Sequence, residues 1–186
     1  EDIKAIRSLD ADIDGKADLV VLTTRRLQVF SQKDGVWTPN FGVDLPGDAT
    51  SFVAADFDDD ADLPPADQQG KFVPPADPEF VVSGPGGLWV FENQRAADGT
   101  RTLVLQAKDA PWADASDVNA VVLLDLDGDG DLDIFAGGPT PRWFIYRGKF
   151  LFGEVTERTQ SPPAGFRATA AVVVDWDRDV DLDLIV

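Results

Sequence analysis

The 186-residue sequence contains no cysteine and no histidine. Without cysteine the chain forms no disulfide bonds and has no thiol nucleophile. Without either residue type it lacks the side chains that hold most structural zinc ions. A Ser-His-Asp triad is excluded as well, because histidine is its general base. The absence of cysteine does not by itself indicate a cellular compartment.

Basic residues are scarce. There are 16 Lys and Arg residues against 34 Asp and Glu residues, so the formal net charge is -18 and the pI is near 4.1. A surface this acidic does not attract nucleic acid or an anionic membrane. No stretch is typical of a signal peptide or a transmembrane segment. Because Glu1 and Asp2 lead directly into a strand-like segment, we expect a mature or excised piece of a longer protein.

The acidic residues are concentrated in short loops, and residues 125–133 form the clearest one. Five aspartates alternate there with other residues, and Gly128 and Gly130 let the backbone curl. Two carboxylates ~4 Å apart repel by about 1 kcal/mol in water and about 4 kcal/mol at an effective dielectric constant near 20. A cation would relieve this repulsion. The loop offers an oxygen ligand set that suits calcium. It consists of the side chains at positions one, three, five and nine and the backbone carbonyl at position seven.

The same spacing recurs three times, which makes an accidental acidic surface turn a poor explanation. In the second copy, a proline-rich segment at 64–78 reads as an insertion, and Glu79 then aligns with position nine. The predicted metal-site residues, with those at position seven included for their carbonyls, are Asp10, Asp12, Asp14, Lys16, Asp18, Asp56, Asp58, Asp60, Asp62, Glu79, Asp125, Asp127, Asp129, Asp131, Asp133, Asp175, Asp177, Asp179, Asp181 and Asp183.

These loops are not EF-hands, because position twelve lacks the required Glu and the flanking residues are β-branched and aromatic. The four copies also differ from one another. Position six carries Ala61 in the second loop and Val180 in the fourth, where a left-handed backbone favours glycine. Arg178 in the fourth loop is a cation that could partly replace the metal. We therefore expect the third loop to bind calcium best, then the first, the fourth and the second.

Between the loops, short apolar runs and glycine turns indicate four strands per repeat. In the first repeat, Pro39 to Asp48 reads as a connector rich in proline and glycine. The loops start at residues 10, 56, 125 and 175, so the period is near fifty once the insertion is removed. This predicts an all-β fold of β-propeller blades, with about three and a half blades at residues 1–48, 49–116, 117–166 and 167–186. We expect the core to lie between neighbouring blades, with contributions from Trp37, Trp89, Trp112 and Trp143.

The repeating unit, an apolar strand followed by Asp-x-Asp-x-Asp-Gly-x-x-Asp-Leu and a second strand as in Asp133–Gly138, resembles the FG-GAP/VCBS family of integrin-α-like propeller repeats. The segment from Phe152 onward is similar to bacterial members joined to ASPIC/UnbV-type domains. The resemblance implies calcium in the hairpin loop between the first two strands of each blade. It also implies an exported protein that binds a partner through the propeller faces.

Propellers close with typically 4–8 blades, so three and a half blades leave open edges. Three arrangements remain: a fragment of a longer protein, which we favour, two copies that form one ring, or a partial propeller capped by a partner. We expect no membrane insertion and no nucleic-acid binding.

For function, we expect a calcium-stabilised, non-catalytic scaffold outside the cytoplasm (extracellular, periplasmic or at the cell surface) that binds protein or carbohydrate. The alternatives are a module or subunit of a larger exported enzyme, and an assembly subunit whose 64–78 insertion contacts another chain. Catalysis by the carboxylates is disfavoured, because they read as metal ligands.

Overall fold

The computed structural model describes residues 2–57, 77–107, 110–156, 166–178 and 183–186. Every regular element in these ranges is a β-strand, as the alternating apolar pattern predicts. Over the same ranges, no helix has the length and hydropathy needed to cross a membrane.

The strands form four antiparallel sheets, each with its strands in chain order. The first sheet contains β1 (Ile3–Leu9), β2 (Asp18–Thr23), β3 (Arg26–Lys33) and β4 (Val36–Asp44). The second contains β5 (Ser51–Ala55), β6 (Glu79–Gly84), β7 (Gly87–Arg95) and β8 (Arg101–Leu105). The third contains β9 (Ala120–Leu124), β10 (Asp133–Gly137), β11 (Arg142–Tyr146) and β12 (Phe152–Glu154), and the last pairs β13 (Val172–Val174) with β14 (Asp183–Ile185).

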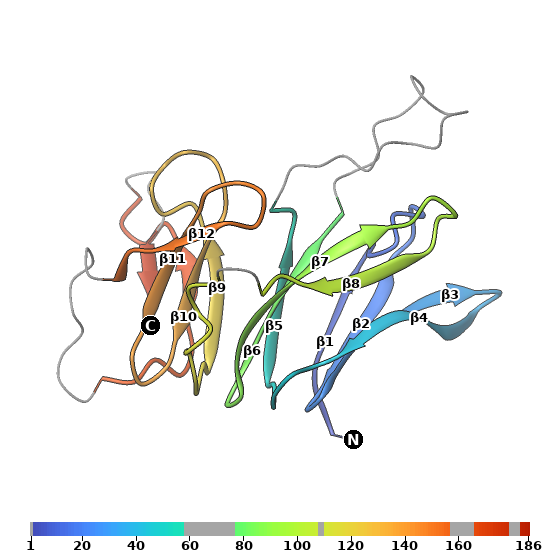
Figure 1. The fold of residues 1–186 in the computed structure, drawn as a ribbon, viewed down its shortest axis with the longest axis horizontal. Coiled ribbons are helices and arrows are strands. Elements are labelled where there is room, and N and C mark those ends of the chain that lie inside the picture. The colour runs from blue at the N-terminus through green and yellow to red at the C-terminus, as the bar shows by residue number, and fades with distance from the viewer. Residues whose placement is uncertain (1, 58–76, 108–109, 157–165, 179–182) are drawn as a thin grey trace.

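The first three sheets stand beside one another as separate blades, and the β1–β2 and β9–β10 connections both lie at the upper end in Figure 1. Tight turns join some consecutive strands, such as β3 and β4. Asp34 and Gly35, for example, both have positive φ (51° and 79°), as expected for a two-residue hairpin turn. The described residues therefore form a partial β-propeller of three four-stranded blades and one two-stranded sheet, which confirms the predicted fold class. The four sheets fall within the four predicted repeats, whose limits stay predictions.

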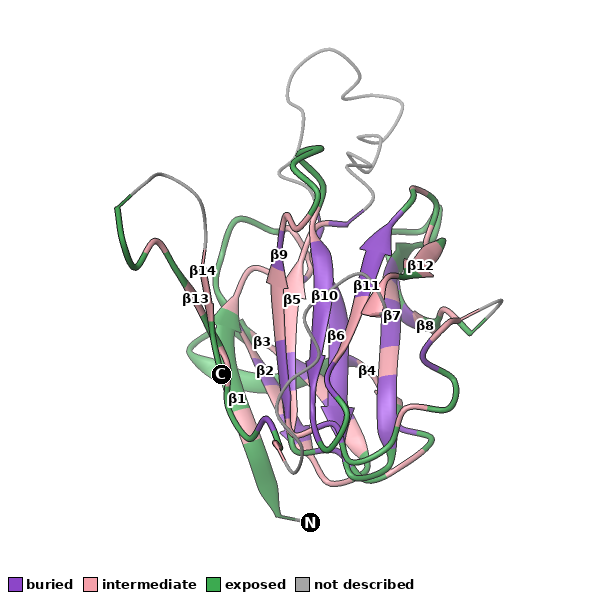
Figure 2. Ribbon diagram, turned by 90° about the vertical axis from the view of Figure 1, so that its left-hand side faces the viewer, coloured by how far each residue is buried: buried purple, intermediate pink, exposed green. Residues whose placement is uncertain are grey.

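The core lies between blades, as predicted. Phe80 and Val82 on one face of β6 pack against the first blade, whereas Val81 on the other face packs against the third. β10 repeats this arrangement, with Ile134 facing the second blade and Phe135 the last sheet. Both strands are buried along their whole length (Figure 2). The second and third blades thus each contribute to two apolar layers, and burial of a large side chain contributes about 1.5–3 kcal/mol.

Two local predictions are wrong. Trp37 does not join the core, since 40% of its surface is exposed, whereas Trp112 is buried and Trp89 and Trp143 are partly buried. The residues from Pro39 were predicted to begin a connector, but β4 continues to Asp44. A register shift between Gln28 and Phe30 accommodates the longer strand. β4 is at the edge of its sheet, where the missing N–H of a proline costs no ladder hydrogen bond.

Candidate metal sites

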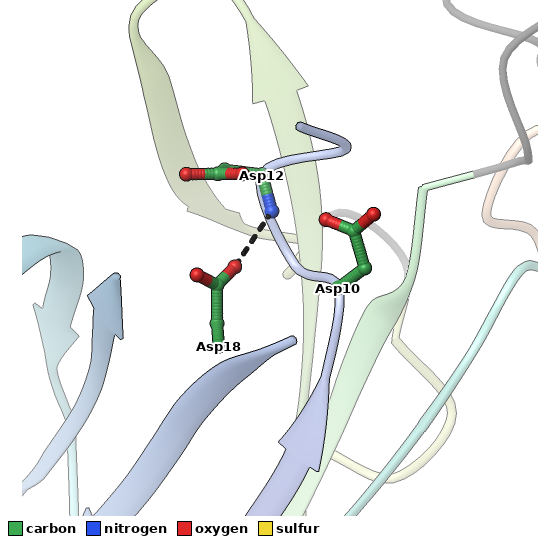
Figure 3. Close-up of side chains that lie close together, drawn as sticks. All are labelled: Asp10, Asp12 and Asp18. Atoms are coloured by element: carbon green, nitrogen blue, oxygen red, sulfur yellow. Dashed lines mark hydrogen bonds between the residues drawn. The ribbon is translucent and has the colours of Figure 1, made fainter. Parts of the chain in front are cut away.

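Three acidic loops bring carboxylates together at positions one, three and nine. In each loop, one oxygen from each of the three side chains lies within 4.8 Å of the other two. The groups are Asp10, Asp12 and Asp18; Asp125, Asp127 and Asp133; and Asp175, Asp177 and Asp183. Figure 3 shows the first group, in which Asp18 extends from the start of β2 toward the loop that carries the other two.

The position-nine acid closes each loop. Asp18 Oδ2 accepts a hydrogen bond from the backbone N–H of Ala11, at position two, at 2.9 Å. The equivalent bonds are Leu126 N–H to Asp133 at 2.8 Å and Trp176 N–H to Asp183 at 2.8 Å. In every copy this acid pairs across the sheet with the residue just before position one.

The second copy keeps this closure with a longer side chain. Glu79 pairs with Ala55 across the sheet, and its Oε2 accepts the Phe57 N–H bond at 3.0 Å. Both observations agree with the alignment of Glu79 to position nine. Asp56 lies among the described residues, whereas Asp58, Asp60 and Asp62 lie outside them, as do Asp179 and Asp181 of the fourth loop.

The position-one carboxylate shapes the turn. Asp10 accepts backbone N–H bonds from Asp14 (3.1 Å) and Gly15 (2.9 Å). Asp125 accepts them from Gly128 (2.7 Å), Asp129 (3.2 Å) and Gly130 (3.0 Å). Position six is left-handed in both loops, with φ of 85° at Gly15 and 97° at Gly130, which accounts for the glycines there.

Position four is also left-handed, which the sequence analysis missed. It is occupied by Ile13 (φ 59°), Gly128 (φ 77°) and Arg178 (φ 66°). Only the third loop has glycine at both strained positions. A β-branched residue such as Ile13 is disfavoured there, at a cost on the order of 1–2 kcal/mol.

The position-five aspartates of the first and third loops accept hydrogen bonds from the backbone two residues further on. They do not belong to the carboxylate groups of those loops. Asp14 Oδ1 accepts the Lys16 N–H bond at 2.9 Å, and its Oδ2 lies 2.9 Å from Lys16 Nζ. The hydrogen bond from Lys16 lowers the pKa of Asp14. Asp129 Oδ1 accepts the Asp131 N–H bond at 3.0 Å. Both side chains stay within the loop, close to the residues that form the groups.

The position-nine carboxylates of the first and third loops are buried in an electrostatically unfavourable place. Asp18 and Asp133 are each 1% exposed. Burial raises the pKa of both, and the nearby negative charges of Asp12 and of Asp127 act in the same direction. Ionised carboxylates are costly here unless a cation compensates them. The donor set consists entirely of oxygens, so the residues fit a hard divalent ion of the calcium or magnesium type.

Further residues, which the sequence analysis did not identify, support the first loop. Asp12 Oδ2 accepts hydrogen bonds from Ser31 Oγ at 3.0 Å and Asn40 Nδ2 at 2.9 Å, on β3 and β4. Asn93 and Arg101 of the second blade contact the loop backbone. No motif in the sequence marks these partners, because the last two are 82 and 89 residues away from the atoms they bind.

A second feature is an open groove of about 470 Å³ beside the third blade. It is lined by residues that include Asp114, Ser116, Thr140, Arg142 and Glu154. Arg142 binds Glu154 and Asp114, both at 2.6 Å. These contacts raise the pKa of Arg142 and lower those of Glu154 and Asp114. The groove therefore presents hydroxyl and carboxylate groups around a fixed guanidinium.

Fold and loops together define a repeat protein of the β-propeller class, with an acidic loop between the first two strands of each blade. The model of a family described as FG-GAP-like repeat matches residues 76–136 and again 125–186, which together are more than half of the chain. The chain belongs to the FG-GAP-like repeat family, as the resemblance indicated. No curated protein gives a significant match. The link to ASPIC/UnbV-type domains stays a prediction.

Proposed function

We propose that this propeller-like scaffold binds calcium in its acidic loops. The observation that carries the proposal is the repeated grouping of three carboxylates, one of them buried in the first and third loops, around a turn held by its own backbone. Calcium takes 6–8 oxygen ligands. The position-five side chains of Asp14 and Asp129 and the position-seven carbonyls of Lys16 and Asp131 bring the donor residues of the first and third loops to five each. Bidentate carboxylates or water supply the remaining oxygens.

The calcium is structural. All its protein ligands come from one hairpin loop and the strand that follows, so the ion ties the first two strands of a blade together. Binding to the folded state alone stabilises the protein by about 2.7 kcal/mol per site when free calcium is a hundredfold above Kd. Dissociation constants of ~10⁻⁴–10⁻³ M are usual for extracellular modules. A calcium-rich compartment outside the cytoplasm suits such sites.

The scaffold serves non-catalytic binding of protein or carbohydrate, as a free module or as part of a larger exported enzyme or complex. The groove beside the third blade supports this part of the proposal, because hydroxyls and carboxylates form hydrogen bonds with sugars and with peptide backbones. Ser116→Ala with Thr140→Val is expected to weaken binding on glycan or peptide arrays without changing the melting temperature. Undiminished binding by this double variant would exclude the groove.

Thermal denaturation tests the metal sites. The protein is measured in EDTA, in calcium and in magnesium at equal ionic strength. Calcium is expected to raise the melting temperature by several degrees, and magnesium to do so less, because magnesium requires a smaller octahedral site and retains its water. A melting temperature that is the same in EDTA and in calcium would contradict the proposal.

A further inference from the structure

The second blade holds the backbone of the first acidic loop. Asn93 on β7 donates a hydrogen bond from Nδ2 to the Ala11 carbonyl at 2.9 Å. Arg101 on β8 donates from Nε to the Asp12 carbonyl at 3.1 Å. These carbonyls belong to positions two and three of the loop. The backbone N–H groups of the same two residues donate hydrogen bonds to Asp18. Asp12 is thus fixed through its carboxylate by the first blade and through its main chain by the second.

Arg101 is itself held by a buried ion pair. Its Nη1 lies 2.5 Å from Asp77 Oδ2, and both side chains are 2% exposed. An ion pair this deeply buried requires good geometry, because both charges have lost their water. The pairing also explains how an arginine can lie beside an acidic loop without replacing the metal. Its charge is matched by Asp77, and toward the loop it donates to a backbone carbonyl.

The next pair of blades makes the same kind of contact with different chemistry. Phe57, at position two of the second loop, packs against Tyr146 of β11 at 6.0 Å and Phe152 of β12 at 5.9 Å between ring centroids. The last two strands of one blade therefore contact the beginning of the acidic loop of the preceding blade at both junctions. The contact is polar at Ala11 and Asp12 of the first loop and aromatic at Phe57 of the second.

We propose that Asn93, Arg101 and Asp77 are positioning residues for calcium in the first loop, so that metal binding there and packing of the second blade strengthen each other. The inference rests on the proposed calcium binding. Residues that orient metal ligands without touching the metal typically change affinity by about 10–100-fold when they are removed. The first loop should show this dependence, and the third loop should not depend on these three residues.

Calcium titration followed by ¹H–¹⁵N NMR distinguishes the two loops, because Gly15 and Gly130 each report on one of them at position six. Arg101→Met is expected to raise the calcium concentration at the Gly15 midpoint about tenfold or more and to leave the Gly130 midpoint unchanged. The matched control is Arg95→Met, which removes the same charge from the exposed residue paired with Arg101 across β7 and β8. The control should move neither midpoint.

Equal shifts of both midpoints in Arg101→Met, or no shift of either, would overturn the inference. If that variant does not fold, Asn93→Ala decides the question. It keeps the ion pair and removes only the bond to the Ala11 carbonyl, and an unchanged Gly15 midpoint would again overturn the inference. If neither glycine responds to calcium in the unmodified protein, the proposed function itself fails, which is a different result from a failure of coupling.

Discussion

Replacing Asp133 by Asn separates the two roles proposed for this side chain, closing the turn and binding calcium. Its Oδ2 accepts the Leu126 N–H bond and its Oδ1 accepts the Tyr146 N–H bond, both at 2.8 Å. Asparagine has one acceptor oxygen, so one of the two donors loses its partner, at a cost of about 1–3 kcal/mol. Burial raises the pKa of the Asp133 carboxylate, which means that the buried charge is unfavourable. Its removal therefore offsets part of this cost. We expect a net loss of about 1–2 kcal/mol without calcium.

Calcium should enlarge the difference. If the proposed site binds calcium, the unmodified protein should gain about 2.7 kcal/mol from it at a hundredfold excess of free calcium over Kd. The variant lacks one of the three grouped carboxylates and should lose most of this gain at the third loop. One kcal/mol corresponds to about 2–4 °C for a chain of this length. The calcium-dependent part alone therefore amounts to about 5–11 °C in melting temperature.

Asp131→Asn is the matched control, because it removes the same charge from an exposed position of the same loop. Only the carbonyl of Asp131 is proposed to bind the ion, so this variant should keep most of the calcium response. Melting is followed by circular dichroism in EDTA and over a calcium series. A full calcium response in Asp133→Asn would refute the ligand role. An equal loss in Asp131→Asn would show that net charge, and not coordination, determines the response.

Three further predictions concern the strain, the core and the charges. Ile13→Gly should stabilise the calcium-free protein by about 0.5–1 kcal/mol in urea denaturation. It removes the backbone strain of a β-branched residue in the left-handed region, at some cost in the entropy of the unfolded chain. A loss of stability would contradict this. Phe91→Ala should cost about 3–5 kcal/mol in the same assay and Trp37→Ala less than about 0.5 kcal/mol, since the first is fully buried and the second 40% exposed; similar costs would refute the packing described. Arg142 lowers the pKa of Glu154 below 4.5, so their coupling in a double-mutant cycle should be about 0.5–1 kcal/mol at neutral pH and disappear as the pH falls through the lowered pKa. Coupling that stays the same when Glu154 is protonated would show that the ion pair is not its source.

Much of each blade could be predicted from the sequence because the relevant physics is local. A hairpin turn such as Asp34-Gly35 fixes which strands pair. The nine-residue spacing fixes which acid closes each uninterrupted loop. Glu79 was identified across a long interruption because the strand after it matches the strand after Asp133. This match holds because the register of β5 and β6 is set by the buried faces of the strands and not by the length of the loop between them.

The contacts between blades could not be predicted in the same way. Asn93 and Arg101 contact the first loop from strands that follow a different acidic loop. The residues next to them in the sequence do not indicate this contact. Pro39 favoured a connector because proline usually ends a strand, yet an edge strand tolerates it. In each case the deciding factor is the place of the residue in the assembled sheet, which local pattern does not contain.

Trp37 shows how the repeat explains even the prediction that was wrong. The residue after position nine pairs with an equivalent phenylalanine on the third strand of each complete blade, and these are Phe30, Phe91 and Phe144. Two residues further along that strand, the pairs formed with the fourth strand are Gln32 with Trp37, Asn93 with Leu103, and Tyr146 with Phe152. Asn93 of the second pair and both residues of the third pair contact the position-two residue of the acidic loop in the preceding blade. Trp37 therefore belongs to the equivalent pair of the first blade. The strand register of a blade determines which residue faces a neighbouring loop, but only the presence of that neighbour decides whether the residue is buried.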